Sequence, residues 1–278
     1  MDEYLGPLEV RIGSPVTWHH GLMARWWAEF GEAEDAELAF YRGAIERFGE
    51  PALDLACGAG RLLLPLVEAG LDVDGVDLST DMLAQARLLA DARGLSPSLI
   101  AQAMHELDLP RRYRTIFICD SFGIGGDGGL ALAALGRSFD HLEPGCALIF
   151  SHDLPYGVQE AEWLRWLPGR RGDPEPWPVE GDTRRSADGD ELELLVRERS
   201  FDPLRQQTIL EVRCRRWRRK QLVEQEEHTI MLADFFAREV QRMLEDVGFE
   251  EVETQGRYTG TPATPDDPTV VFLARRPI

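Results

Sequence analysis

Two glycines one residue apart, Gly58 and Gly60, mark the part of the sequence best suited to chemistry. They follow an apolar run that contains an acid, Asp54, and they precede a leucine-rich stretch. This order predicts a strand, a tight turn and the start of a helix, where a bare backbone and free N–H groups let a nucleotide-like ligand approach closely. A second acid, Asp77, ends the next apolar run, 71–78, where it could accept hydrogen bonds from both ribose hydroxyls. Together these features indicate a site for an adenosyl cofactor, and the alternative is a purely structural turn.

These motifs resemble those of the class I S-adenosylmethionine (SAM)-dependent methyltransferases. The resemblance rests on the glycine motif of residues 54–60, on Asp77-Leu78-Ser79, and on Gly248-Phe249 before the closing strand pair. It covers roughly residues 45–152 and 232–276. It implies a doubly wound, Rossmann-like α/β sheet of seven strands with an antiparallel last strand, SAM as the cofactor, and methyl transfer as the activity.

The resemblance also implies which residues hold the cofactor. Asp54 and the two glycines would line its methionine and ribose part, Asp77 the ribose, and Leu78 one face of the adenine. One departure concerns Ala103, because the family often has an acid there that contacts the adenine amine. The full predicted cofactor set is Asp54, Ala56, Gly58, Gly60, Asp77, Leu78, Ala103, Met104 and Cys119.

The catalytic residues are harder to predict. The sulfonium of SAM already activates the methyl group, so the protein mainly places a nucleophile in line with it and excludes water. Three candidates follow the expected fourth and fifth strands, namely Asp120, His152 and Tyr156. The adjacent pair His19-His20 does not share one face of a helix, and the four cysteines lack metal-ligand spacing, so no metal site is predicted.

The net charge and the absence of one motif indicate which kind of molecule accepts the methyl group. The formal net charge of −19 would repel a phosphate backbone, which disfavours nucleic acid as a partner. The chain contains no asparagine, which removes the Asn-Pro-Pro-Tyr motif of base and glutamine methyltransferases. We therefore expect a small-molecule acceptor, methylated on nitrogen or oxygen, and held against rings such as those of Trp18, Trp26 or Trp163.

Three alternatives stay open. A non-catalytic SAM-binding protein would keep the glycine motif but lack an open acceptor pocket. A dinucleotide-binding oxidoreductase would need a third glycine, and Leu63 stands at that position. An RNA or protein methyltransferase would use the basic segment Arg213–Lys220 as a binding surface. The simpler interpretation of that segment is a strand whose arginines pair with Glu224, Glu226 and Glu227 on its neighbour.

The elements that position these residues fall into four predicted segments. Residues 1–48, rich in aromatic residues, form an N-terminal helical cap, and 49–152 form the SAM-binding core. Residues 153–231 form an inserted antiparallel β lid of three short strands, at 192–201, 207–217 and 223–231. Residues 232–278 supply a helix over 232–247 and the last two strands of the core.

The composition predicts the size of the folded domain and the cellular compartment of the protein. A chain of 278 residues with 44% hydrophobic residues can bury a full core in one large α/β domain with an appendage. Its apolar stretches are strand-sized and its first residues lack the features of a signal peptide, so we expect a cytoplasmic protein that does not enter a membrane. The sequence is also compatible with a homo-oligomer.

Overall fold

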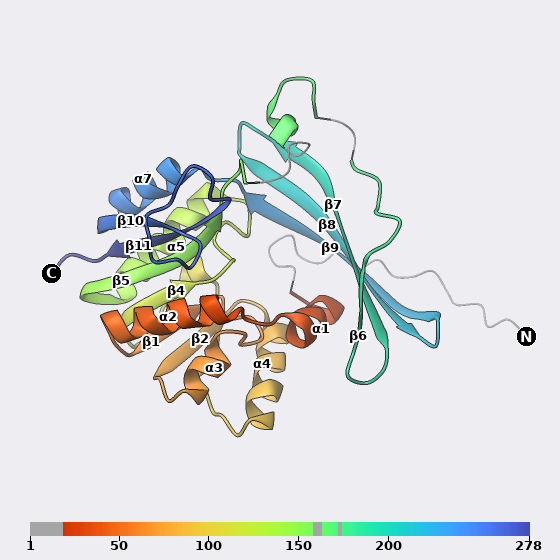
Figure 1. Cartoon of the computed structure of the whole chain (residues 1–278), viewed down its shortest axis with the longest axis horizontal. Helices are drawn as coiled ribbons and strands as arrows, with labels where there is room; N and C mark the ends of the chain where they lie inside the picture. The colour runs from red at the N-terminus through yellow and green to blue at the C-terminus, as the bar shows by residue number, and fades with distance from the viewer. Residues whose placement is uncertain (1–18, 158–162, 172–173) are drawn as a thin grey trace, which may run out of the picture.

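The computed structural model describes residues 19–157, 163–171 and 174–278 (Figure 1). Its centre is a seven-stranded sheet with the order β10-β11-β5-β4-β1-β2-β3. Strands β1 to β5 pair in parallel, whereas β11 runs antiparallel to both of its neighbours. The predicted fold class is therefore confirmed. The strands are β1 Ala52–Leu55, β2 Val73–Asp77, β3 Leu99–Ala101, β4 Tyr113–Ile118, β5 Leu142–Asp153, β10 Glu250–Gly256 and β11 Thr269–Arg275.

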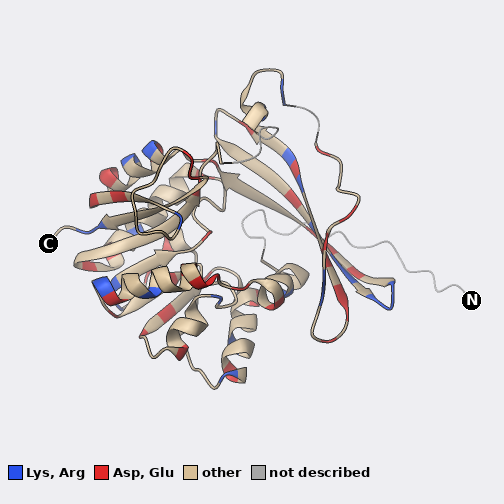
Figure 2. Ribbon diagram, in the orientation of Figure 1, with Lys and Arg blue, Asp and Glu red and all other residues tan. Residues whose placement is uncertain are grey.

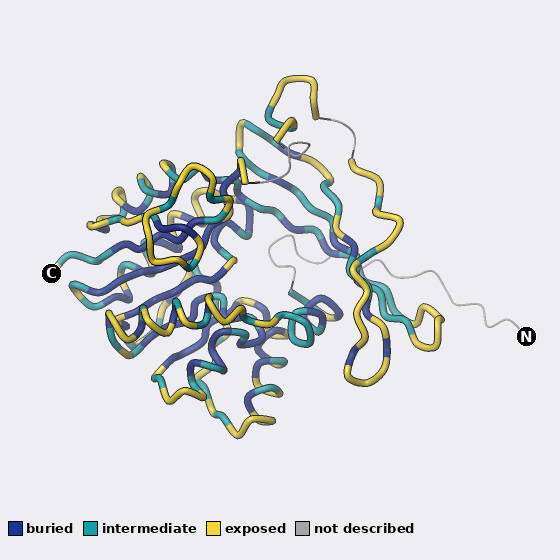
Figure 3. The backbone as a smooth tube through the Cα atoms, in the orientation of Figure 1, coloured by how far each residue is buried: buried dark blue, intermediate teal, exposed yellow. Residues whose placement is uncertain are grey.

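Helices cover both faces of this sheet. One face packs against α2, α3 and α4 through residues such as Tyr41, Leu63 and Leu83. The other packs against α5 and α7 through residues such as Leu135 and Leu244. Figure 3 shows the resulting pattern, in which the sheet is buried and the outer sides of the helices are exposed. The helices are α1 Gly21–Phe30, α2 Asp35–Phe48, α3 Leu63–Glu68, α4 Thr80–Ala92, α5 Gly128–His141 and α7 Ala237–Val247, with short 3-10 helices at Met104–Glu106 and Leu164–Trp166.

The insertion differs from the prediction of three short strands. It is a four-stranded antiparallel sheet with the order β6-β7-β8-β9. Strand β6 escaped prediction because its four residues are polar and exposed and show no apolar alternation. The other three strands are 12 or 13 residues long, since ion pairs continue the ladder beyond the apolar stretch. The strands are β6 Asp182–Arg185, β7 Glu191–Asp202, β8 Gln207–Arg218 and β9 Gln221–Ala233.

The helix predicted over 232–247 begins later than expected. Strand β9 continues to Ala233, and α7 starts at Ala237. The backbone N–H of Phe236 donates to the Glu239 carboxylate at 2.7 Å, which satisfies an otherwise free donor at the helix start. At the other end, Gly248 adopts the left-handed conformation that commonly terminates a helix.

The first helix joins the inserted sheet to the core. Leu22, Met23 and Trp26 of α1 pack against Val212 and Ile230 of the insertion. On the opposite side of α1, Ala24 packs in one cluster with Met82 of α4 and Ala59 of the glycine turn. This helix therefore lies between the two sheets and borders the space above the carboxyl ends of the parallel strands (Figure 1).

The basic segment lies on β8 and in the following turn. Arg213 and Arg216 form ion pairs with Glu227 and Glu224 on β9, as the simpler interpretation predicted. Arg216 and Arg218 also share the buried carboxylate of Asp190. Figure 2 shows acidic and basic residues interleaved along this sheet, so these arginines are neutralised by neighbours.

The longest of the described helices have 14 residues, and none of them has the length and apolar character needed to cross a membrane.

Candidate active site

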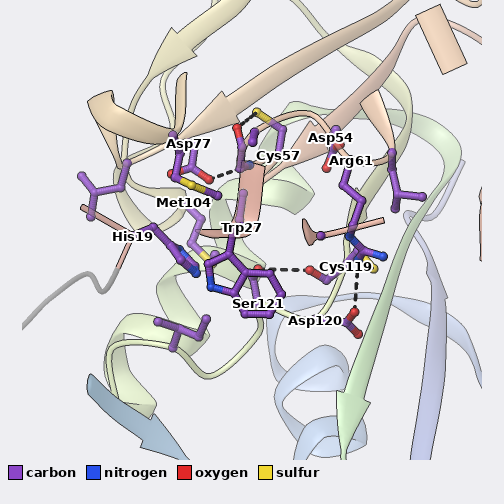
Figure 4. Close-up of a pocket in the computed structure, with 18 of the residues that line it drawn as sticks. His19, Trp27, Asp54, Cys57, Arg61, Asp77, Met104, Cys119, Asp120 and Ser121 are labelled. Atoms are coloured by element: carbon purple, nitrogen blue, oxygen red, sulfur yellow. Dashed lines mark hydrogen bonds and ion pairs between the residues drawn. The ribbon is translucent and has the colours of Figure 1, made fainter. Parts of the chain in front are cut away.

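A cleft of about 420 Å³ opens at the carboxyl ends of the parallel strands, a volume typical of small-molecule sites. Its walls come from the glycine turn, the ends of β2 and β4, the segment after β3, and α1 (Figure 4). Eight of the nine predicted cofactor residues line it. The ninth, Gly60, lies in the glycine turn but outside the cleft wall, and a side chain there would meet Leu64 of α3. The residues that line the cleft include His19, Trp27, Phe30, Glu32, Asp54, Gly58, Arg61, Asp77, Leu78, Ala103, Met104, Cys119 and Asp120.

The turn after β1 has the backbone conformation that the two glycines predicted. Gly58 and Gly60 have φ angles of 56° and 87°, a region that side chains disfavour. Ala56 shares this region with a φ of 69°, and no pattern in the sequence predicts that conformation. A positive φ at a residue other than glycine stores strain and is frequent at functional sites. The turn is held in this shape because Ala56 and Cys57 both donate their N–H groups to the carbonyl of Val76 on β2.

Asp77 is the most tightly positioned acid at one end of the cleft. One carboxylate oxygen accepts the N–H of Gly58 at 2.8 Å, and the other accepts the N–H of Ser79 at 2.7 Å. Burial raises the pKa of this carboxyl, and the two N–H bonds oppose that effect. Each oxygen keeps a lone pair that can accept a hydroxyl donor. Two ribose hydroxyls fit this arrangement.

The residues predicted for the adenine lie beside Asp77. Leu78 is 42% exposed, which is unusual for a leucine and leaves its side chain free to cover a flat ring. Ala103 and Met104 border the same end of the cleft. A polarisable methionine sulfur packs well against an aromatic surface. The side chains therefore fit an adenine without the acid that the family often has at Ala103.

The opposite end of the cleft contains Asp54 and Asp120 (Figure 4). Asp54 at the end of β1 is 2% exposed, and burial raises its pKa to about 8, against the opposing effect of Arg61. A neutral carboxyl in that place would ionise when a cation binds beside it. The ammonium and sulfonium groups of SAM are such cations.

Sequence reasoning missed a cluster next to Asp54. Arg61 donates to the buried carboxylate of Glu37 on α2 and to Asp120, 3.2 Å away. The other oxygen of Glu37 accepts from the Cys119 thiol at 2.8 Å and from the Tyr258 hydroxyl at 3.1 Å. Only the position of Arg61, directly after the second glycine, could have drawn attention to it.

The three catalytic candidates are not brought together. Asp120 lines the cleft with a φ of 52°, and the Ser151 hydroxyl donates to it at 2.8 Å. His152 is buried outside the cleft, where its Nε2 lies 2.9 Å from the carbonyl oxygen of Phe235 and burial lowers its pKa. Tyr156 is 42% exposed and is also absent from the cleft wall. Only Asp120 is therefore placed to meet a reacting group.

The aromatic residues predicted to hold the acceptor are placed differently. Trp26 is buried against the insertion, Trp163 lies outside the cleft, and Trp18 lies outside the described residues. Trp27 and Phe30 of α1 line the cleft instead. The aromatic pattern of the cap predicted packing but did not show which face of α1 meets the ligand.

His19 also lines the cleft, unlike its neighbour His20. Burial first, and then the charges of His20 and His228, lower the pKa of His19 to about 3. This histidine is thus neutral at physiological pH. Among the described residues, one group could approach a metal ion together, namely Glu37, Cys119 and Asp120. The Arg61 guanidinium already forms ion pairs with both carboxylates of that group. Their negative charge, which would attract a metal ion, is therefore balanced by this arginine.

Known proteins match this chain at the level of sequence and of fold. A model of the methyltransferase domain family matches residues 52–145. A ubiquinone biosynthesis O-methyltransferase of Nitrobacter winogradskyi is 32% identical over 123 residues, which are 42% of this chain and 46% of that protein. The corresponding enzyme of Azorhizobium caulinodans is 29% identical over 69% of this chain and 85% of its own length. The first of these matches thus spans about half the length of the relative.

Solved structures resemble the chain over nearly its full length. A SAM-dependent methyltransferase from Clostridium acetobutylicum has a TM-score of 0.70 and 16% identity, with 92% of this chain and 98% of that chain covered. The sugar N-methyltransferase KedS8 from a Streptoalloteichus species has a TM-score of 0.65 and 21% identity, with 97% and 100% covered. At these identities the likeness concerns the fold. The family model thus shows a methyltransferase domain over residues 52–145, and the likeness of fold to SAM-dependent methyltransferases extends over nearly the whole chain.

Proposed function

We propose that this protein transfers the methyl group of SAM to a nitrogen or oxygen atom of a small molecule, and that this molecule carries an amine. The observation that carries the proposal is the cleft itself. One end presents Asp77, Leu78 and Met104 for an adenosine, and the other presents acids for the cationic part of the cofactor. The domain match over residues 52–145 supports the same cofactor.

The charges along the cleft favour a cationic acceptor. Its described wall contains four carboxyl groups, on Glu32, Asp54, Asp77 and Asp120, but Arg61 is the one arginine or lysine there. That arginine already pairs with Asp120 and with Glu37. A carboxylate or phosphate on the acceptor would meet repulsion, whereas an ammonium would be attracted.

The chain's own groups would act by placement and by proton handling. SAM supplies an electrophilic methyl group when bound. Asp120 is fixed by Ser151 and Arg61 and can accept an N–H of the amine, which holds the nitrogen and takes up its proton. Trp27 and Phe30 on α1 border the same space and help to exclude water, and their rings can attract a cation.

The names of the similar proteins support the proposal that the methyl acceptor is a small molecule. Those similar in sequence include ubiquinone biosynthesis O-methyltransferases, and those similar in fold include sugar and glycopeptide N-methyltransferases. We further propose that the cap, residues 1–48, and the insertion, 153–231, act together as a lid, because α1 packs on the inserted sheet and also borders the cleft.

An acceptor panel tests the proposed function. The protein is incubated with SAM carrying a labelled methyl group and with amines, phenols, peptides or tRNA. Transfer to amines is expected, and Asp120→Asn should lower kcat by about 100-fold or more while Kd for SAM changes much less. Transfer to tRNA that weakens steeply with salt would contradict the proposal and would favour the RNA alternative.

The basic segment supplies a second test of that alternative. Arg213 and Arg216 form ion pairs within the inserted sheet, so Arg213→Gln and Arg216→Gln should leave methyl transfer within about twofold of the parent. A loss of transfer that scales with the number of removed arginines would show that this surface binds the acceptor.

A further inference from the structure

The segment of residues 121–126, which follows β4, lines the cleft and is also paired with the inserted sheet. The N–H of Gly125 donates to a carbonyl of β9 at 2.8 Å, and the carbonyl of Gly123 accepts an N–H of β9 at 2.8 Å. These two bonds flank an antiparallel bridge between Ile124 and Leu232. The segment therefore extends the inserted sheet beyond β9, and the proposed function gives this pairing no role.

The bridge determines the direction of the Ile124 side chain. When the hydrogen bonds flank an antiparallel pair, the two side chains lie close together on the same face of the sheet. Leu232 marks that face, because it packs against the same apolar cluster as Trp27 and Phe30 of α1. Ile124, Trp27 and Phe30 all line the cleft. The apolar face of the inserted sheet thus continues into the cleft wall.

The position of Ile124 is fixed from two sides. The side chain of Gln207 on β8 donates to the carbonyl of Gly126, which holds the segment against the sheet. A Cβ added to Gly126 would lie 2.5 Å from the Cβ of Met231 on β9, so the two backbones approach each other closely. On the other side, Phe122 is buried in the core of the seven-stranded sheet. Ile124 is therefore part of a rigid wall.

The polar groups of this segment already have partners within the protein. The N–H groups of Ile124, Gly125 and Gly126 all donate to backbone carbonyls. The hydroxyl of Ser121 donates to the carbonyl of Cys119 at 3.0 Å. A ligand hydroxyl that is buried without a partner of its own loses free energy. This wall is therefore suited to an apolar surface and is poorly suited to a hydroxyl-rich one.

The apolar wall lies directly after the acid that the proposed function assigns to the amine. Asp120 precedes the segment, and Ile124, Leu130 and Ala131 follow it along the same side of the chain and also line the cleft. An amine held by Asp120 would bring the rest of its molecule against these side chains. Contact with them removes apolar surface of the ligand from water, which favours binding.

We infer that the acceptor carries its amine on an apolar alkyl or ring body, and that Ile124 contacts this body and limits its size. This inference rests on the proposed function and names the class of amine. Asp120 holds the nitrogen, whereas Ile124 selects what the nitrogen is attached to. Because the wall is rigid, a larger body is rejected by overlap and a smaller one loses contact.

A matched pair of amines tests the class of acceptor. Cyclohexylamine and glucosamine both carry an amine on a six-membered ring, but glucosamine adds hydroxyl groups. Methyl transfer from labelled SAM is measured for each. The parent should have a kcat/KM for cyclohexylamine that is about 10-fold or more above that for glucosamine.

Substitutions of Ile124 test the residue itself. Ile124→Val and Ile124→Thr have nearly the same shape and differ in a hydroxyl, so their comparison isolates polarity. The Thr variant should have a kcat/KM for cyclohexylamine about 5- to 10-fold below that of the Val variant, with glucosamine changed by less than about twofold. Ile124→Ala should raise kcat/KM for tert-butylcyclohexylamine relative to cyclohexylamine by about 10-fold, because the wall recedes.

Controls address the cofactor and the position. The Kd for SAM, measured by calorimetry, should stay within about twofold of the parent in all three variants, because Ile124 is assigned to the acceptor. Leu132→Ala removes a leucine of α5 that is 41% exposed and lies outside the cleft wall. This variant should leave the ratios between the amines unchanged.

The outcomes are distinguishable. A parent that prefers glucosamine, or Val and Thr variants with equal values, would overturn the inference and leave the proposed function intact. A Kd for SAM that rises as much as kcat/KM falls would also overturn it, since Ile124 would then act on the cofactor. If the parent binds SAM but methylates none of the amines, the proposed function fails and the inference fails with it.

Discussion

Binding of SAM should release a proton from Asp54. Burial raises the pKa of this carboxyl to about 8 in the ligand-free protein, so it is roughly 90% protonated at pH 7. A sulfonium or ammonium placed beside it favours the ionised form and lowers that pKa. If the pKa falls to about 6 in the complex, binding at pH 7 releases about 0.8 protons, and affinity rises about 50-fold between pH 6 and pH 9.

Calorimetry measures this proton directly. SAM is titrated into the protein at pH 7 in buffers with different ionisation enthalpies, and the slope of the observed enthalpy gives the number of protons released. The α-amino group of the ligand titrates in the same pH range, so the variant Asp54→Asn supplies the baseline. An equal proton count in parent and variant would refute the assignment of Asp54 to the cationic part of the cofactor.

Three further predictions follow from the same geometry. Asp77→Ala should weaken SAM binding by about 1.5–3 kcal/mol, measured as the change in Kd, because two ribose hydroxyls lose a charged acceptor; an unchanged Kd would exclude this contact. Gly58→Val should abolish binding measured by calorimetry, since its φ of 56° is closed to a branched residue, and retained affinity would mean that the turn is only structural. Hydrogen exchange over residues 19–48 should slow when S-adenosylhomocysteine is added, and indifference to that ligand would contradict the lid proposal.

The sequence predicted the part of the fold whose apolar pattern is regular. Buried parallel strands such as β4 consist of apolar runs, and the turn after β1 has the positive φ angles that its two glycines indicate. The polar strand β6 and the charged ends of β7 to β9 lack such a pattern. They form because backbone pairing and cross-strand ion pairs hold them, which depends on neighbours distant in the sequence.

The same distinction holds for the site. Most of the cofactor residues lie on short motifs with a fixed geometry, and all of them except Gly60 line the cleft. The cluster of Arg61 with Glu37 and Tyr258 joins segments that are 24 and 221 residues apart, measured from Glu37. No spacing could indicate such a contact. His152 was a candidate because it was expected at the end of the fifth strand. It lies within β5 and its ring contacts the carbonyl of Phe235, a direction that strand order alone does not show.

The central claim is that this cleft binds SAM through the contacts described. It is tested most directly by titrating the purified protein with SAM and, separately, with NAD, alongside the Asp77→Ala variant. We predict that SAM binds in a one-to-one complex that Asp77→Ala weakens and that NAD does not bind. Binding of NAD with no binding of SAM would contradict the claim and would favour the dinucleotide-binding alternative.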